Sequence, residues 1–163
     1  MMDNDQADRS DRSQDRWWPS FGDVSKALVP TPLVLLGLTV WIDAPTLTIE
    51  AGEPLEFTIN IRNRLPLPVA LTTAEPQLWG WEIGGQYKGK KEPTFPDRTE
   101  TYAFEALETK RFHQEWAGRF QTTNDGHKTW PQAAPGEYEL RAFIYHPNAK
   151  RYGLTDAISI RVK

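Results

Sequence analysis

Apolar and polar residues alternate with a period of two along several segments of this chain. The clearest segment is residues 55–63, whose apolar members are Leu55, Phe57, Ile59 and Ile61. Every second side chain of a β-strand points to the same face, so this pattern is typical of a sheet with one buried and one solvated face. It predicts a β-strand over these nine residues.

Similar signals recur at short intervals and are separated by turns rich in proline and glycine. They predict further strands at residues 33–42, 46–50, 69–73, 77–83, 102–106, 111–116, 137–145 and 156–162. No segment shows a convincing helical period. About seven to nine short strands predict an all-β chain, folded as an immunoglobulin-like two-sheet antiparallel β-sandwich with Greek-key links. Tyr138 follows a Pro-Gly turn at the start of a late strand, where sandwich domains carry a tyrosine corner.

The N-terminal residues differ from the rest of the chain. Residues 1–16 are almost wholly polar, with five Asp and three Arg, and such a segment cannot bury enough apolar surface to offset its ordering entropy. We therefore expect residues 1–27 to be a disordered or weakly docked tail and residues 28–163 to be the sandwich domain. The Asp-rich start does not resemble a signal peptide, so a cytoplasmic location is expected.

Residues 28–42 form the longest apolar run. At about 15 residues it is shorter than the ~20 that a helix needs to cross a bilayer, and it contains Pro30, Pro32 and Gly37. The sequence favours buried strands here, with membrane association through this run as the minor alternative.

Composition excludes several kinds of chemistry. The chain of 163 residues has no cysteine, which excludes disulfides, thiolate zinc sites and cysteine nucleophiles. Its formal net charge is −3, so there is no basic excess of the kind that drives sequence-independent binding to nucleic acid.

Two long loops, residues 84–98 and 120–134, are predicted, and residues 86–98 and 120–130 within them are expected to contact another protein. The first, residues 84–98, mixes basic and aromatic side chains, namely Tyr87, Lys88, Lys90, Lys91, Phe95 and Arg98. Such residues can meet an acidic protein patch, can stack on single-stranded nucleic acid, or can serve only to keep an edge soluble. The second, residues 120–134, contains Trp130.

The chain is also rich in tryptophan, with seven in all. Trp79 and Trp81 occupy alternate positions of one predicted strand and therefore share a face. An exposed pair would form an aromatic platform for carbohydrate, whereas a buried pair would belong to the core of the sandwich.

No arrangement of residues indicates catalysis. His113, Glu115, His127 and His146 are the histidines and a neighbouring acid, but no motif sets the distances that three or four metal ligands require. We expect no enzyme activity, no cofactor and no metal, with a hydrolase or metal enzyme as the remaining alternative.

Two regions of the chain, residues 55–71 and 107–142, resemble a known family. LEFTINIRNRLPLPVAL contains Asn63 at the end of an apolar strand and then Pro68-Val69, and the later stretches LETKRFHQEWAG and APGEYELRA contain Trp116 and Pro135-Gly136-Glu137-Tyr138. At these positions the chain is similar to the intracellular proteinase inhibitor family first described in bacilli, whose members are immunoglobulin-like β-domains. The family's Pro-Gly-Glu before the Trp-bearing strand is Glu108-Thr109-Lys110 here, and its Gly-rich middle loop is replaced by the basic residues 84–98.

The resemblance implies a sandwich domain that binds a protein and inhibits or regulates a protease. Together with the loops on a rigid frame, it predicts a non-enzymatic protein-binding module. The alternative is a carbohydrate-binding or cell-surface-associated module that uses exposed tryptophans.

Overall fold

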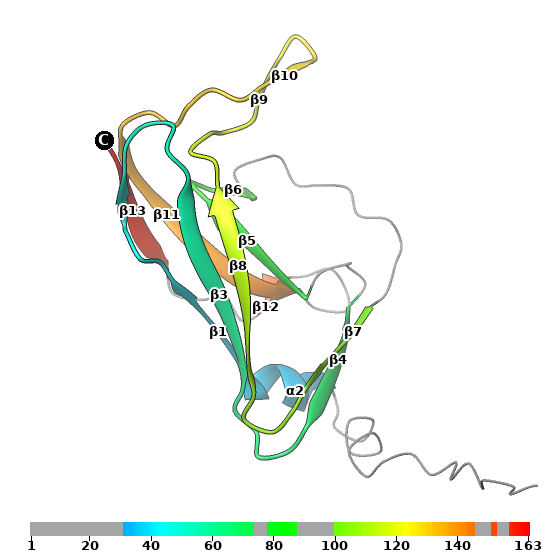
Figure 1. The fold of residues 1–163 in the computed structure, drawn as a ribbon. Helices are drawn as coiled ribbons and strands as arrows, with labels where there is room; N and C mark the ends of the chain where they lie inside the picture. Colours follow the sequence, from blue (N-terminus) through cyan, green and yellow to red (C-terminus); the bar gives the residue numbers. More distant parts are fainter. Residues whose placement is uncertain (1–30, 74–77, 88–99, 146–150, 153–156) are drawn as a thin grey trace, which may run out of the picture.

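Two β-sheets face each other across a buried apolar core in the computed structural model (Figure 1). The structure describes residues 31–73, 78–87, 100–145, 151–152 and 157–163. The first sheet has the order β1 (Leu38–Asp43), β3 (Leu55–Asn63), β8 (Thr109–Trp116). The second has the order β2 (Thr48–Ile49), β13 (Ile158–Val162), β11 (Gly136–Tyr145), β5 (Trp79–Ile83), β6 (Gln86–Tyr87), with β12 (Arg151–Tyr152) paired to β11.

The strand order is that of an immunoglobulin-like sandwich. The rows β1-β3-β8 and β13-β11-β5 match the A-B-E and G-F-C rows of that fold, and the chain alternates between the two sheets as a Greek key requires. All the pairings are antiparallel except that of β2 with β13. The predicted all-β sandwich is therefore confirmed.

The period-two pattern of β3 places its apolar side chains in the core. Leu55, Phe57, Ile59 and Ile61 are all at most 2% exposed, whereas Glu56, Thr58 and Arg62 on the outer face are partly or fully exposed. Asn60, on the same outer face, is buried. Burying such apolar side chains stabilises the fold by roughly 1.5–3 kcal/mol each relative to leaving them in water. The observed bounds of β3 and of β4 (Val69–Thr73) are those that the sequence predicts.

The sequence predicted strand throughout residues 33–42. The structure instead has a helix followed by a strand in this apolar run. Helix α2 (Thr31–Gly37) has Pro32 in its first turn, where a missing N–H costs nothing. Val34 and Leu35 of the helix are buried, as is Leu38 at the start of β1, so the helix turns one side toward the core. Exposed leucines at positions 33 and 36 hide that period in the sequence.

Two smaller ladders complete the fold. β4 pairs with β7 (Glu100–Phe104), and α2 packs against β4 (Figure 1). β9 (Thr122–Asn124) pairs with β10 (His127–Thr129), within a segment predicted to be loop.

No helix in the described ranges is both long and apolar enough to cross a membrane. The predicted tail, residues 1–27, lies outside the described residues.

The predicted tyrosine corner is confirmed. The Tyr138 hydroxyl donates a hydrogen bond of 2.8 Å to the carbonyl oxygen of Ala134, four residues upstream and just before β11. This bond ties the chain that enters β11 to the sandwich.

Candidate functional site

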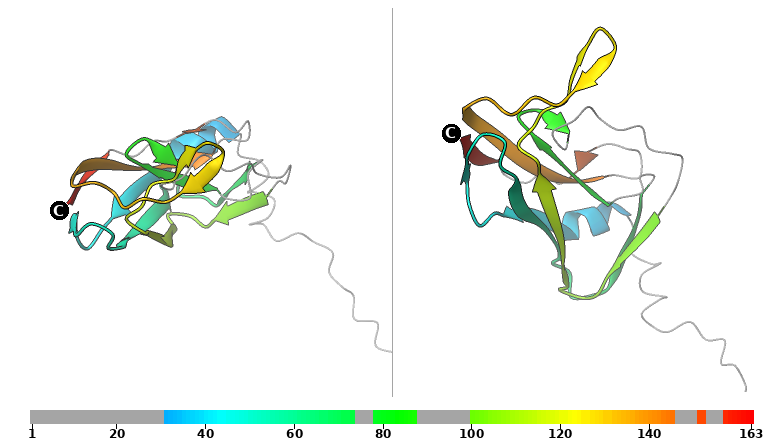
Figure 2. Two further views of the ribbon diagram at one scale, coloured as in Figure 1. Left: turned by 90° about the horizontal axis from the view of Figure 1, so that it is seen from above. Right: turned by 45° about the horizontal axis from the view of Figure 1, so that its top comes forward.

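The β9–β10 hairpin projects from one end of the sandwich (Figures 1 and 2). Its turn is formed by Asp125 and Gly126, with φ angles of 49° and 80°. Two consecutive positive φ angles are typical of a type I′ turn, which matches the twist of two-residue hairpins. Residues 123–130 are all exposed, so almost the entire hairpin is available to another molecule.

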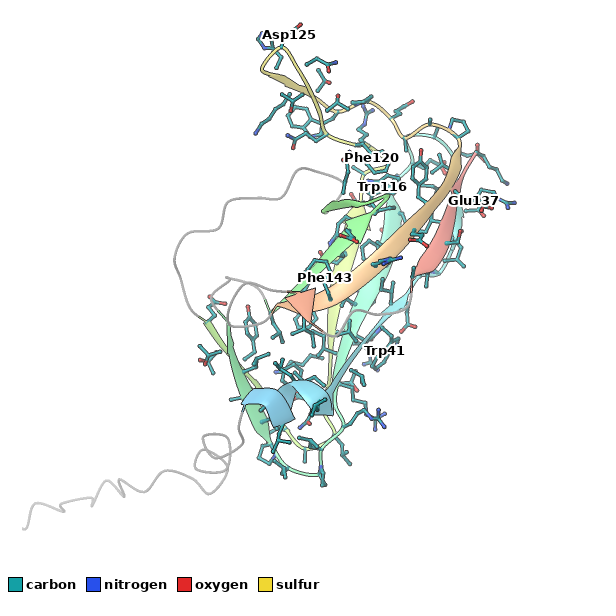
Figure 3. All side chains as sticks on the ribbon, turned by 180° about the vertical axis from the view of Figure 1, so that it is seen from behind. Trp41, Trp116, Phe120, Asp125, Glu137 and Phe143 are labelled. Carbon is teal, nitrogen blue, oxygen red and sulfur yellow. The ribbon has the colours of Figure 1, made fainter. Side chains whose placement is uncertain are left out.

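Three aromatic rings form a base beneath the hairpin, and we call them the aromatic base. Trp116, Phe120 and Tyr138 lie with ring centroids 5.2 to 6.2 Å apart. Figure 3 shows Trp116 and Phe120 at the foot of the hairpin and Asp125 at its tip. Each such ring pair contributes about 0.5–1.5 kcal/mol beyond its buried area, so the base holds the segment that carries the hairpin firmly.

Main-chain hydrogen bonds join the two segments that lead into and out of the hairpin. The Phe120 N–H donates to the Pro131 carbonyl over 3.1 Å, and the Ala133 N–H donates to the Gly118 carbonyl over 2.8 Å. The hairpin therefore continues a paired ribbon and is not a loose loop.

Two glycines allow this close packing. Gly118 has a φ of 65°, and a Cβ there would lie 2.5 Å from the carbonyl oxygen of Glu53. A Cβ on Gly84, in the turn between β5 and β6, would lie 3.1 Å from ring atoms of both Phe120 and Tyr138. The β5–β6 turn thus abuts the aromatic base, so the first predicted contact loop leaves the sandwich beside the hairpin.

Trp130 is the predicted contact residue that the structure describes in full. It follows β10 and is 46% exposed. Its carbonyl oxygen accepts a hydrogen bond from Nη1 of Arg119 over 3.1 Å, and Arg119 in turn accepts a bond at its carbonyl from the indole of Trp116 over 3.0 Å. The backbone of Trp130 is therefore linked through Arg119 to Trp116 of the aromatic base, while its indole remains exposed.

The other predicted contact residues are only partly described. Tyr87 ends β6, and Lys88, Lys90, Lys91, Phe95 and Arg98 lie outside the described residues. The structure therefore does not test their role in binding.

Of the two alternatives for the tryptophan pair, the structure bears out the core and not the aromatic platform. Trp79 and Trp81 do share a strand face, but that face is the inner one, and they are 7% and 4% exposed. Trp81 meets Phe57 edge-on at 5.1 Å, and its indole N–H donates to Gln114 over 3.2 Å. The pattern identified the shared face correctly but could not tell the inner face from the outer one.

The histidines do not gather into a metal site in the described part of the chain. His113 and Glu115 share the outer face of β8, as expected, and His113 Nδ1 lies 3.0 Å from the Thr58 hydroxyl. Within the described residues, no group of three or more potential ligands could hold a metal ion. His146 lies outside those residues.

The sequence contained a signal for the hairpin that the prediction of a loop missed. Asp125-Gly126 is a strong hairpin dipeptide, and it stands between short Thr-containing segments. Because those segments lack alternating apolar residues, periodicity did not reveal them.

A family model matches residues 26–163. The chain belongs to a family of unknown function, DUF7974. The match includes both sheets, the aromatic base and the hairpin. No curated protein matches the chain.

Several solved structures are similar at low sequence identity. A β-glucosidase from Listeria innocua in complex with isofagomine is 14% identical with a TM-score of 0.47, over 77% of this chain and 16% of the enzyme. The CARDB domain of PF1109 from Pyrococcus furiosus is 16% identical with a TM-score of 0.46, over 77% of this chain and 94% of that domain. The DNA glycosylase AlkC from Pseudomonas fluorescens is 9% identical with a TM-score of 0.42, over 78% of this chain and 30% of the glycosylase. The chain thus spans only a small part of the two enzymes.

Proposed function

We propose that this chain is a non-enzymatic protein-binding module that contacts its partner through the β9–β10 hairpin and Trp130. The single observation that carries the proposal is an exposed hairpin mounted on the aromatic base, whose Trp116 is buried and whose Phe120 and Tyr138 are partly buried. The basic loop that follows β6 is the second expected contact surface.

Rigid mounting favours binding for a physical reason. A loop that is ordered before it meets its partner loses less conformational entropy on binding, so more of the contact energy appears as affinity. Tryptophan is enriched among the residues that dominate interface energies, and Trp130 is the large aromatic side chain that stands exposed at the foot of the hairpin.

The specific version of this proposal is inhibition of a protease, and it rests on the family resemblance of the sequence. Its test is to titrate a subtilisin-type protease with the purified full-length chain and to follow peptide hydrolysis. We expect inhibition that weakens when Trp130 is replaced by alanine. No inhibition at micromolar concentrations would overturn the inhibitor version and leave the binding proposal to its own test.

That second test compares proteins retained from native cells by the wild-type chain, by Trp130→Ala and by the control Arg161→Ala. Arg161 lies in β13, on a different strand from the hairpin, and its side chain is 63% exposed. We expect a partner that the wild type and the control retain and that Trp130→Ala loses. If all three retain the same proteins, the hairpin is not the contact surface.

The carbohydrate-binding alternative, which would use Trp79, Trp81 and Trp130, loses its main support, because Trp79 and Trp81 are buried. The cytoplasmic location belongs to the proposal as well, and fractionation of native cells tests it.

A further inference from the structure

The outer face of the sheet β1-β3-β8 carries a tryptophan that takes no part in the core. Trp41 is half-buried, whereas its neighbours in the strand, Val40 and Ile42, pack against the core cluster. In the register, Trp41 lies opposite Asn60, and Thr39 lies opposite Arg62. Trp41 and Arg62 are thus diagonal neighbours on one face, and Figure 3 shows Trp41 far from the hairpin tip.

A hollow of about 550 Å³ opens beside this tryptophan. The residues that line it are Thr39, Trp41, Arg62, Arg64 and Leu107. It therefore combines an indole ring and a leucine with two guanidinium groups.

Leu107 is held in this hollow by an uncommon backbone conformation. Its φ is 59° and its side chain is 51% exposed, although a left-handed conformation disfavours residues with a Cβ and leucine gains nothing from exposure to water. Strain of this kind clusters at binding sites. A glycine would meet the needs of the turn, so the leucine side chain calls for another explanation.

The two arginines of the hollow have no acidic partner in the described part of the chain. Among the described residues, neither Arg62 nor Arg64 takes part in an ion pair. On β11 and β13, in contrast, Arg141 pairs with Glu139 at 2.8 Å and Arg161 pairs with Glu137 at 2.6 Å. Arg141 and Arg161 of the second sheet are therefore paired with carboxylates, whereas the two arginines of the hollow are not.

The acidic residues of this face lie toward its other end. Glu56 lies opposite Glu115, near the start of β3, whereas Arg62 lies near its end. Asp43 accepts a hydrogen bond of 2.8 Å from Asn60. Glu105 and Glu108 flank Leu107, and the Glu108 carboxylate already accepts from the Glu105 N–H and lies 3.5 Å from the Lys110 ammonium. On the outer face of the sheet, an anionic ligand is therefore attracted to the arginine end and repelled from the other end.

Arg62 is the last residue but one of β3, and Arg64 follows the end of that strand, two positions later; positions two apart along an extended chain lie about 6.6 Å apart. Carboxylates at alternate positions of an extended peptide repeat at the same distance, and a guanidinium group binds a carboxylate through two parallel hydrogen bonds. We propose that this hollow binds an extended acidic segment of a partner protein, with carboxylates at alternate positions on Arg62 and Arg64 and with Trp41 and Leu107 packed against its apolar atoms. This site is separate from the hairpin and does not depend on the function proposed above.

The test measures binding of two fluorescent peptides to the full-length chain by anisotropy. One peptide alternates Glu and Thr, and the other has the same composition with all its Glu residues consecutive. We expect the alternating peptide to bind more tightly, and we expect Arg62→Ala and Arg64→Ala each to weaken it about tenfold. Arg161→Ala is the matched control, because it removes an exposed arginine from the other sheet, and it is expected to change nothing.

Leu107→Gly separates binding from stability. It is expected to weaken the alternating peptide while leaving the melting temperature unchanged or higher, because glycine relieves the backbone strain. Equal affinity for the two peptides, or equal loss in Arg161→Ala and Arg62→Ala, would overturn the proposal. So would tighter binding of a single-stranded oligonucleotide or of phosphatidylserine vesicles than of the alternating peptide.

Discussion

The two ends of the sandwich hold their connecting segments by different chemistry (Figure 1). At one end, β3 turns into β4 while β7 turns into β8, and hydrogen bonds of both turns converge on Asn63. At the other end, three rings of the aromatic base hold the segments that lead to the hairpin. We call the first end the polar corner.

Asn63 uses its whole side chain in the polar corner and is fully buried. Its Nδ2 donates to the carbonyl oxygens of Leu67 and Glu105, each over 2.9 Å, and its Oδ1 accepts from the Leu65 N–H over 3.0 Å. One amide therefore satisfies three main-chain groups in two different connections.

The difference shows how each end tolerates change. In the polar corner a single substitution removes the partner of three main-chain groups in part-buried hydrogen bonds, and each group left buried and unpaired costs about 1–3 kcal/mol. In the aromatic base the contact energy is spread over three rings, so removing one polar atom leaves most of it in place. We therefore expect the corner to be more sensitive to single substitutions than the base.

The largest expected effect is that of Asn63→Ala. It removes all three side-chain hydrogen bonds, and we expect the free energy of unfolding to fall by roughly 3–5 kcal/mol. Urea unfolding of the variant and the wild type measures it.

Asn63→Asp is the matched control, because it preserves the shape of the side chain and its acceptor. It turns the donor that faces Leu67 and Glu105 into an oxygen, so it should destabilise about as much as alanine does. A cost below about 1 kcal/mol for Asn63→Asp together with a large cost for Asn63→Ala would show that packing and not hydrogen bonding holds the corner.

The sequence predicted the regular strands better than the connections. Alternation gave the bounds of β3 and β4, because each strand has one buried face. It failed at α2, where leucines on both faces hide the helical period, and at the β9–β10 hairpin, whose residues are polar on both faces. Periodicity reports which face is buried, so it carries no signal where neither face or both faces are apolar.

The candidate sites show the same limit. Trp130 is exposed and Trp79 is buried. The sequence places Trp130 in a loop and Trp79 in a strand, but it does not show which of the two is exposed. Which face of β5 points inward depends on the sheet that packs against it. The role of Asn63 likewise depends on Glu105, 42 residues later in the chain, although the asparagine itself was noted at the end of its strand.

The second prediction concerns the close packing near the aromatic base. Gly118→Ala forces a left-handed residue to carry a Cβ that would lie 2.5 Å from the Glu53 carbonyl oxygen. We expect a loss of about 2–3 kcal/mol in the free energy of unfolding. Gly126→Ala is the control, since its φ is also positive but nothing lies within 4 Å of its Cβ. If both variants lose the same amount, backbone strain alone explains the effect and the contact with Glu53 is unimportant.

A smaller effect is expected for Tyr138→Phe. It removes the hydrogen bond to Ala134 and retains the ring in the aromatic base, so thermal or urea unfolding should show a loss of about 1 kcal/mol. Tyr138→Ala, which removes the ring as well, should cost about 3 kcal/mol or more. A loss from Tyr138→Phe as large as that from Asn63→Ala would break the comparison, because the base would then also depend on a single hydrogen bond.

The smallest expected effect tests a second polar contact in the ladder beside the polar corner. Burial raises the pKa of Tyr102 above its ordinary value of 10.0, and its hydrogen bond to Glu100 and the charge of that carboxylate raise it further. Because the folded state holds this proton more tightly than the unfolded state does, the contribution to stability is complete below pH 10 and is lost as the pH rises through the folded pKa. Urea unfolding below and above pH 10 should therefore show the wild type losing more stability than Tyr102→Phe does. Glu100→Gln should move the phenol's titration, followed by tyrosinate absorbance, back toward the ordinary pKa. Parallel pH profiles for the wild type and Tyr102→Phe would show that this contact contributes nothing to the ladder, and the sensitivity of this end would then rest on Asn63 alone.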